Sequence, residues 1–164
     1  MGESNDVNIQ PISQGDRAWI KKFYVRRWGS DRVVTRGRLY TVAELPGFIT
    51  WEEDSRVGLL TYHAAGDELE IVTLDSLVQG QGVGSKLISA AIQFAHEKEF
   101  RRVWLITTND NTLALRFYQK NGFTLVKVHK DAIQVSRQLK PEIPMIGLDG
   151  IPILDEIELE YLLS

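Results

Sequence analysis

The 164-residue chain contains no cysteine, which excludes disulfides, thiolate metal sites and cysteine nucleophiles. It also lacks an apolar run of the roughly 20 residues that cross a bilayer. Its first ten residues have neither the basic nor the apolar region of a signal peptide. With a formal net charge of −3 and no long run of Lys or Arg, it has no broad basic face for nucleic acid. We therefore expect a cytoplasmic protein that binds neither membranes nor nucleic acids.

The chain does have enough apolar sequence, 43% of its residues, to bury a core of its own. No internal repeat or low-complexity stretch divides it, so we expect one domain over residues 1–164. Its histidines are scattered, without the paired spacing of a metal site, and we predict no metal.

Periodicity and turn residues predict a mixed α/β chain. Strands are expected over Val7–Ile12, Gly47–Glu52, Val57–Ala64, Leu69–Leu74, Arg101–Thr108 and Phe123–His129. Helices are expected over Gly15–Trp28 after a Ser13 cap, over Val83–Phe100, between Asp110 and Gly122, and over Asp131–Lys140. Residues 29–46 are polar and rich in glycine, which favours a loop with short extended pieces.

The C-terminal sequence EIELEYLL alternates apolar and acidic residues, as a half-exposed strand does. A strand of this kind can pair with a second copy of the chain. A homodimer is therefore left open.

The segment LDSLVQGQGVGSKL, Leu74–Leu87, has three glycines at alternate positions between a strand and a helix. Glycine destabilises a helix interior by roughly 0.5–1 kcal/mol relative to alanine, so these residues indicate a turn or a close backbone approach. A glycine-rich turn that leads into a helix N-terminus presents free N–H groups to an anion. The segment therefore predicts a diphosphate site, with the Ser85 hydroxyl as a further donor.

Two nucleotide motifs can be compared with this segment. A P-loop is excluded because Lys86 stands at the wrong offset from the glycines. The dinucleotide fingerprint G-x-G-x-x-G fits Gly80 and Gly82 but meets Ser85 at its third position, and Asp110 could serve as the ribose-binding acid. Nucleotide binding remains an alternative.

The residues QGQGVG, Gln79–Gly84, resemble the Q/R-x-x-G-x-G/A motif of the GNAT superfamily of N-acetyltransferases. Downstream, NTLALRFYQKNGF, Asn111–Phe123, resembles that family's N-x-x-A-x-x-[LF]-Y-x-K-x-G-F segment. The resemblance implies a mixed, mostly antiparallel central sheet flanked by helices. It also implies transfer of an acetyl group from acetyl-CoA to a primary amine on a small molecule or a peptide.

The resemblance further implies which residues hold the coenzyme. Gln79 stands where the family more often has Arg, and the loop amides that follow it would bind the pyrophosphate. Val72 and Leu74 on the preceding strand would bind the pantetheine arm, and the helix residues Asn111 and Tyr118 would face it. Asn111 has a second reading, as the cap of its own helix. The loop residues implied are Gln79, Gly80, Gly82, Val83, Gly84 and Ser85.

Amide formation from a thioester requires a proton acceptor for the amine and benefits from a proton donor for the thiolate. Tyr118 is our candidate for the donor and Glu70 for the acceptor, with Asp75 or water as alternatives. Simple strand alternation puts Glu68, Glu70 and Val72 on one face, which leaves Glu70 open to a second reading as a solvated acid.

Without cysteine there is no acetyl-cysteine intermediate, which favours direct attack by the amine in a ternary complex. Trp28 and Tyr40 flank the uncertain loop and are candidates for the wall of an acceptor pocket. The competing interpretation is a non-catalytic module that binds a nucleotide or an acyl-CoA.

Overall fold

The computed structural model describes residues 7–163, in which seven strands form one sheet in the order β1-β4-β5-β6-β7-β9-β8. A separate hairpin consists of β2 and β3. The strands are β1 (Asn8–Pro11), β2 (Arg32–Thr35), β3 (Arg38–Thr41), β4 (Gly47–Glu52), β5 (Ser55–Ala65), β6 (Glu68–Ser76), β7 (Arg102–Thr108), β8 (Thr124–His129) and β9 (Glu156–Leu162). The helices are α1 (Arg17–Trp28), α2 (Val83–Glu97), α3 (Thr112–Lys120) and α4 (Ala132–Leu139). No helix in this described part of the chain is long and apolar enough to span a membrane.

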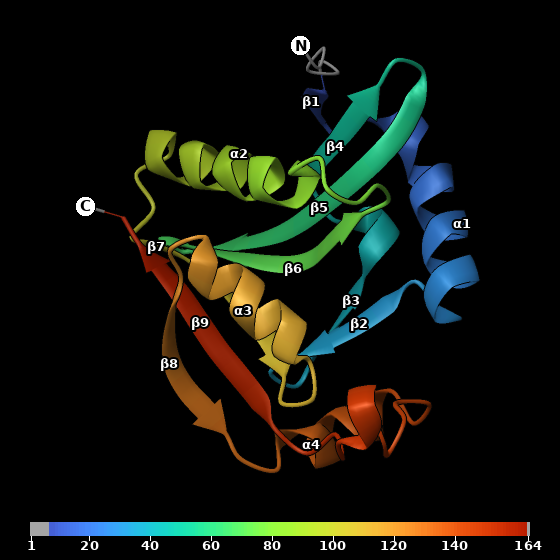
Figure 1. Cartoon of the computed structure of the whole chain (residues 1–164), viewed down its shortest axis with the longest axis vertical. Coiled ribbons are helices and arrows are strands. Elements are labelled where there is room, and N and C mark those ends of the chain that lie inside the picture. Colours follow the sequence, from blue (N-terminus) through green and yellow to red (C-terminus); the bar gives the residue numbers. More distant parts are fainter. Residues whose placement is uncertain (1–6, 164) are drawn as a thin grey trace.

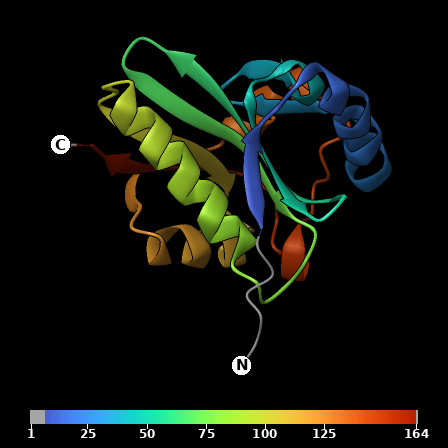
Figure 2. The ribbon, with the colours of Figure 1, turned by 90° about the horizontal axis from the view of Figure 1, so that it is seen from above.

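Helices cover both faces of the sheet (Figures 1 and 2). On the face that we call the α2 face, α2 and α3 pack over a core that includes Leu60, Leu69, Leu87 and Leu105. On the opposite face, the α1 face, α1 closes a smaller core around Ile20, Ile49 and Leu59. The β2–β3 hairpin lies on this second face as well, because Tyr40 of β3 bonds Glu70 there. The sheet therefore separates two hydrophobic cores, one on each face.

The strands β6 and β7 run parallel, whereas the other neighbouring strands of the described sheet run antiparallel. Their pairing ends at Ile71 and Leu105. Both strands continue, to Ser76 and Thr108, without pairing to each other. We call this unpaired stretch the β6–β7 split. It exposes the backbone donors and acceptors of one edge of β6 to a ligand.

A β-bulge changes which side chains of β6 share a face. Thr61 of β5 pairs with Thr73, but the next residue of β5 pairs with Ile71, so that Val72 is the extra residue. The expected alternation therefore holds for Glu68 and Glu70 and ends at Val72. Glu70, Thr73 and Asp75 instead share the α1 face, opposite His63, Thr61 and Leu59 of β5.

Most predicted elements are present, and four differences are informative. The second helix ends at Glu97 rather than Phe100, because Glu99 adopts a left-handed conformation with φ of 60°. The short extended pieces expected within residues 29–46 are the strands β2 and β3, which pair as an ordered hairpin. The C-terminal strand β9 pairs with both β7 and β8, so it has no free edge for a second subunit. The acidic residues of β9 are also not solvated as expected, since Glu156 is only 2% exposed.

Candidate active site at the strand split

The three glycines of the predicted anion site have two different structural roles. Gly80 and Gly82 have left-handed φ values of 76° and 69°, which side chains other than glycine rarely adopt. Gly84 lies in the first turn of α2, where an added Cβ would approach the Phe117 ring of α3 to 3.1 Å. The loop therefore needs glycine for its backbone path, and the helix pair needs glycine for its close contact.

Gly82 is the N-cap of α2, and its carbonyl accepts the first helical hydrogen bond, from the Lys86 amide at 3.0 Å. The amides of Val83, Gly84 and Ser85 precede that bond and have no partner within the helix. The positive end of the α2 dipole points in the same direction. This end of α2 can therefore bind a phosphate group through backbone donors alone.

A cavity of about 440 Å³ connects this loop to β6 and α3. Its walls include eight of the residues expected to hold the coenzyme: Leu74, Gln79, Gly80, Gly82, Val83, Gly84, Ser85 and Tyr118. Val72 and Asn111 are not among the lining residues. The Asn111 side chain instead accepts a hydrogen bond of 3.1 Å from the Ala114 amide, which is the capping role.

Tyr118 lies on α3 beside the split. Its ring packs edge-on against Phe117 and Phe123, with centroid distances of 5.3 and 5.7 Å. Burial raises the pKa of the Tyr118 phenol, and the nearby Asp75 carboxylate raises it further. The phenol is therefore held in its protonated form, which is the form that donates a proton.

Glu70 lies on the other side of the sheet, in a separate cavity of about 200 Å³ on the α1 face. Its side chain is only 3% exposed, so the solvated reading of this residue is wrong. One carboxylate oxygen accepts a hydrogen bond of 2.5 Å from the Thr35 hydroxyl, and the other accepts one of 2.9 Å from the Tyr40 hydroxyl. Burial raises the pKa of Glu70, although these two bonds oppose the shift.

Asp75, the alternative base, occupies the α1 face near the end of β6. It is buried and accepts a hydrogen bond from the Tyr24 hydroxyl of α1. Burial raises its pKa, while Tyr24, Arg27 and Trp28 lower it. Asp75 therefore influences both Tyr24 and Tyr118, whereas Glu70 and Tyr118 line different cavities.

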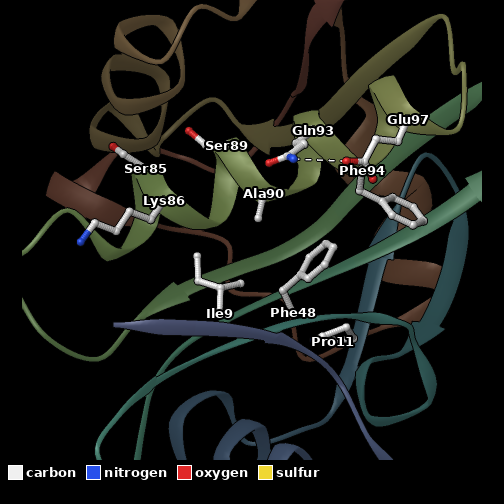
Figure 3. Close-up of a pocket in the computed structure, with 10 residues that line it drawn as sticks. All are labelled: Ile9, Pro11, Phe48, Ser85, Lys86, Ser89, Ala90, Gln93, Phe94 and Glu97. Carbon is white, nitrogen blue, oxygen red and sulfur yellow. Dashed lines mark hydrogen bonds between the residues drawn. The ribbon is translucent and has the colours of Figure 1, made fainter. Parts of the chain in front are cut away.

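A larger cavity, of about 600 Å³, lies elsewhere. It is a groove between β1 and the outer surface of α2, with Ile9, Phe48 and Phe94 as its apolar walls (Figure 3). Neither Glu70 nor Tyr118 lines it, so its size does not make it the candidate site. The described residues also contain no cluster of three or more His, Asp or Glu side chains that could hold a metal ion.

Asp110, the acid considered for a ribose, has a structural role. Its carboxylate is buried and accepts hydrogen bonds from the Thr108 hydroxyl at 2.5 Å and from the Leu148 amide at 3.0 Å. Both oxygens thus connect β7 to the segment that precedes β9. The mostly antiparallel sheet likewise differs from the parallel sheet of a dinucleotide-binding fold.

The sequence indicated Tyr40 as a candidate for the wall of an acceptor pocket, and the structure places it in the Glu70 cavity. The sequence did not indicate most of its neighbours there. The Glu70 cavity is also lined by Arg36, Arg38, His63, Glu68 and Trp104. Trp28, the other candidate, is 58% exposed and does not line it. The signal in the sequence was the pair Arg36–Gly37. In the structure these two residues form the turn of the hairpin, with φ of 48° and 73°, and the hairpin brings these side chains to β6.

Comparison with known proteins places this geometry in a family. The family model described as "Acetyltransferase (GNAT) family" matches residues 17–123. The chain belongs to the GNAT acetyltransferase family. The Bacillus subtilis protein YxbD is 38% identical to this GNAT chain over 152 residues, which cover 92% of the chain and 96% of YxbD.

Solved GNAT structures share the fold. An acetyltransferase from Bacillus subtilis in complex with CoA aligns with a TM-score of 0.69 at 19% identity, over 97% of this chain and 100% of that one. A GNAT family acetyltransferase from Elizabethkingia anophelis with acetyl-CoA bound also has a TM-score of 0.69, at 20% identity, over 97% and 99% of the two chains. The expected GNAT fold, a mostly antiparallel mixed sheet between helices, is therefore confirmed.

Proposed function

We propose that this chain is an acetyl-CoA-dependent N-acetyltransferase in which a primary amine attacks the thioester directly. The observation that carries the proposal is the β6–β7 split. A phosphate-binding helix terminus and a protonated tyrosine lie on its α2 face, and a buried carboxylate, Glu70, lies on its α1 face.

Residues of the α2 face fit acetyl-CoA. The free amides of Val83, Gly84 and Ser85 bind the pyrophosphate, and the unpaired edge of β6, from Val72 to Leu74, binds the pantetheine arm. When bound, acetyl-CoA supplies a thioester carbonyl as the electrophile. An amide N–H near Leu74 stabilises the oxyanion.

Residues on both faces then move protons. Glu70 accepts a proton from the ammonium group and makes the nitrogen nucleophilic, for which its raised pKa is suited. The C–N bond forms, the C–S bond breaks, and Tyr118 donates its proton to the departing thiolate. The attacking nitrogen gives up its second proton to water, which leaves the neutral amide. The protonated Glu70 and the deprotonated Tyr118 return to their starting states by exchange with water. The Asp75 charge, which raises the pKa of Tyr118, keeps the phenol protonated between turnovers.

The first test is thermal unfolding with coenzyme A, acetyl-CoA or NAD added separately. A ligand at 100 times its Kd stabilises a protein by about 2.7 kcal/mol, which for a chain of this size raises Tm by roughly 5–10 °C. We expect this shift with both coenzyme A species and none with NAD. A shift with NAD alone contradicts the proposal and supports a nucleotide-binding module.

Catalysis is tested by initial rates of coenzyme A release at varied acetyl-CoA and amine concentrations. Direct attack in a ternary complex predicts intersecting double-reciprocal lines, whereas parallel lines would indicate a covalent acetyl-enzyme. A protein that binds acetyl-CoA and releases no coenzyme A with any amine is a binding module.

A further inference from the structure

The Glu70 cavity carries opposite charges at its two ends. Its lining includes the buried Glu70 and the half-buried Trp104 and His63. Arg38, an exposed residue of β3, lies at its rim. A small molecule in this cavity meets a carboxylate at depth and a guanidinium at the opening.

The Glu70 carboxylate can accept further hydrogen bonds from a ligand. A carboxylate has about four acceptor positions, and Glu70 uses one on each oxygen, for Thr35 and Tyr40. The remaining positions can accept N–H bonds from an amine. Because the side chain is 97% shielded from solvent, an amine that binds there forms its bonds with little competition from water.

The charge of Arg38 acts on Glu70, but among residues 7–163 the Arg38 guanidinium forms no direct ion pair with a carboxylate. Its Nη1 atom lies 2.9 Å from the Nε2 atom of His63, which must be unprotonated to accept this bond. Arg36, Arg101 and Arg102, which neighbour the same region, all form ion pairs with glutamates. Arg38 is therefore available to bind an anion.

The rim is held in place by contacts at both ends of the hairpin. At the tip, the Arg36 amide and guanidinium donate bonds of 3.1 and 3.3 Å to the buried Glu156 of β9. At the base, the Lys140 ammonium donates a bond of 2.8 Å to the Arg32 carbonyl. The backbone that carries Arg38 is thus held beside the strand that carries Glu70.

We propose that the acetyl acceptor is a small free amino acid, with its amine on Glu70 and its carboxylate on Arg38. This inference rests on the proposed function and specifies its acceptor. Tyr40, which bonds Glu70 and also interacts with Arg38, lies between the two charges, so the amine and the carboxylate must be only a few bonds apart.

Cavity size and charge favour a free amino acid over a peptide. The volume of about 200 Å³ corresponds to roughly seven water molecules at about 30 Å³ each, and lies below the range of drug-sized sites. A peptide N-terminus has an uncharged amide where a free amino acid has its carboxylate. It would leave Arg38 without an anion, and its chain would have to leave the cavity past the charged rim.

The test is a matched panel of acceptors: the proteinogenic amino acids, their carboxamides, and the amines that lack the carboxyl group. For the best amino acid we expect kcat/KM to exceed that of its carboxamide by about 10- to 100-fold, the range for a hydrogen-bonded charged group. In Arg38→Gln this ratio falls to near one, and Arg38→Lys restores part of it. The ratio is informative because any change that Arg38 makes to Glu70 affects both acceptors alike. Arg26→Gln, an exposed arginine of α1, is the control and leaves the ratio unchanged.

A binding measurement provides a readout that does not depend on turnover. Calorimetric titration of the preferred amino acid into protein saturated with coenzyme A should give a Kd that Arg38→Gln weakens about 10- to 100-fold. Equal rates with amino acids and carboxamides, or a ratio that Arg38→Gln does not change, overturn this inference and leave the acetyltransferase proposal intact. Release of no coenzyme A with any amine, despite acetyl-CoA binding, contradicts the proposed function and this inference with it.

Discussion

The Tyr40 hydroxyl donates a hydrogen bond of 2.9 Å to Glu70, and this contact joins residues 30 positions apart in the chain. Burial raises the pKa of Tyr40 to about 12, and the Glu70 charge raises it as well, so the phenol remains a donor at neutral pH. The bond in turn opposes the effect of burial on Glu70. The hairpin that lines the acceptor cavity therefore also tunes the candidate base.

Tyr40→Phe should raise the pKa of Glu70 further, because it removes a donor to the charged form. The acidic limb of the kcat/KM profile should move to higher pH, with kcat/KM lowered at neutral pH. Initial rates between pH 5 and 9 check this. Tyr62→Phe is the matched control, since Tyr62 packs against Phe48 and Phe94. A profile that is unchanged in Tyr40→Phe would argue against Glu70 as the titrating base.

Tyr118→Phe should lower kcat by about 10²-fold, the lower end for loss of a general acid. The phenylalanine ring keeps the contacts with Phe117 and Phe123, so acetyl-CoA binding and Tm should remain close to wild type. Steady-state kinetics together with a thermal shift by coenzyme A separate the two effects. A variant with full kcat would remove Tyr118 from the mechanism.

Gly82→Ala should weaken acetyl-CoA binding by straining the left-handed cap of α2, at a cost of about 1–2 kcal/mol. No atom lies within 4 Å of the added Cβ, so the effect is on the backbone conformation. Gly66→Ala is a matched control, because Gly66 has φ of 61° and equally open surroundings in the β5–β6 turn. Calorimetric titration with acetyl-CoA should show a higher Kd for Gly82→Ala alone. Equal losses of Tm with no change of either Kd would mean that the loop does not hold the ligand.

The stability of the fold should fall as pH rises through the pKa values of Glu70 and Asp75 in the folded state. Burial raises both pKa values above their ordinary values of 4.5 and 3.8, so the unfolded chain releases these protons at a lower pH than the folded chain does. The free energy of unfolding therefore decreases with pH over that interval. Urea unfolding between pH 4 and 8 checks the slope, which Glu70→Gln should flatten.

Asp16 should change the pH dependence of the free energy of unfolding in the direction opposite to Glu70. Burial opposes its ionisation, but hydrogen bonds from Ser13 and Arg56 lower its pKa overall. Its contribution to the free energy of unfolding is therefore present above its unfolded pKa and is lost on acidification. Asp16→Asn should remove stability at neutral pH and less at low pH. If Glu70→Gln and Asp16→Asn changed the pH dependence in the same direction, the assigned sign for Glu70 would be wrong.

The predictable parts of this protein are those that local sequence determines. The positions of α2 and α3 were predicted from the helical spacing of apolar residues and from the glycines that precede Val83 and end α3 at Gly122. Most residues implied in coenzyme binding line one cavity, because they belong to one continuous loop and to the helices beside it. The position of this loop does not depend on strand pairing between residues that are far apart in the sequence.

The acceptor side could not be predicted because it depends on long-range register. The bulge at Val72 exists only in the pairing of β5 with β6, and it reverses the face of every later β6 residue. The hairpin tip is fixed by Glu156, 120 positions from Arg36. Alternation along one strand contains neither fact. The bulge decides the faces of Thr73 and Asp75, and the hairpin that bonds Glu70 decides that this residue is buried.

The most direct test of the account is the rate of coenzyme A release by wild type and by Glu70→Gln, measured across pH with a saturating amine acceptor. The account predicts that the substitution lowers kcat by about 10²- to 10⁴-fold and removes the acidic limb of the profile, with acetyl-CoA binding unchanged. A wild-type rate and pH profile in Glu70→Gln would contradict it, and the proton acceptor would then have to be Asp75 or water.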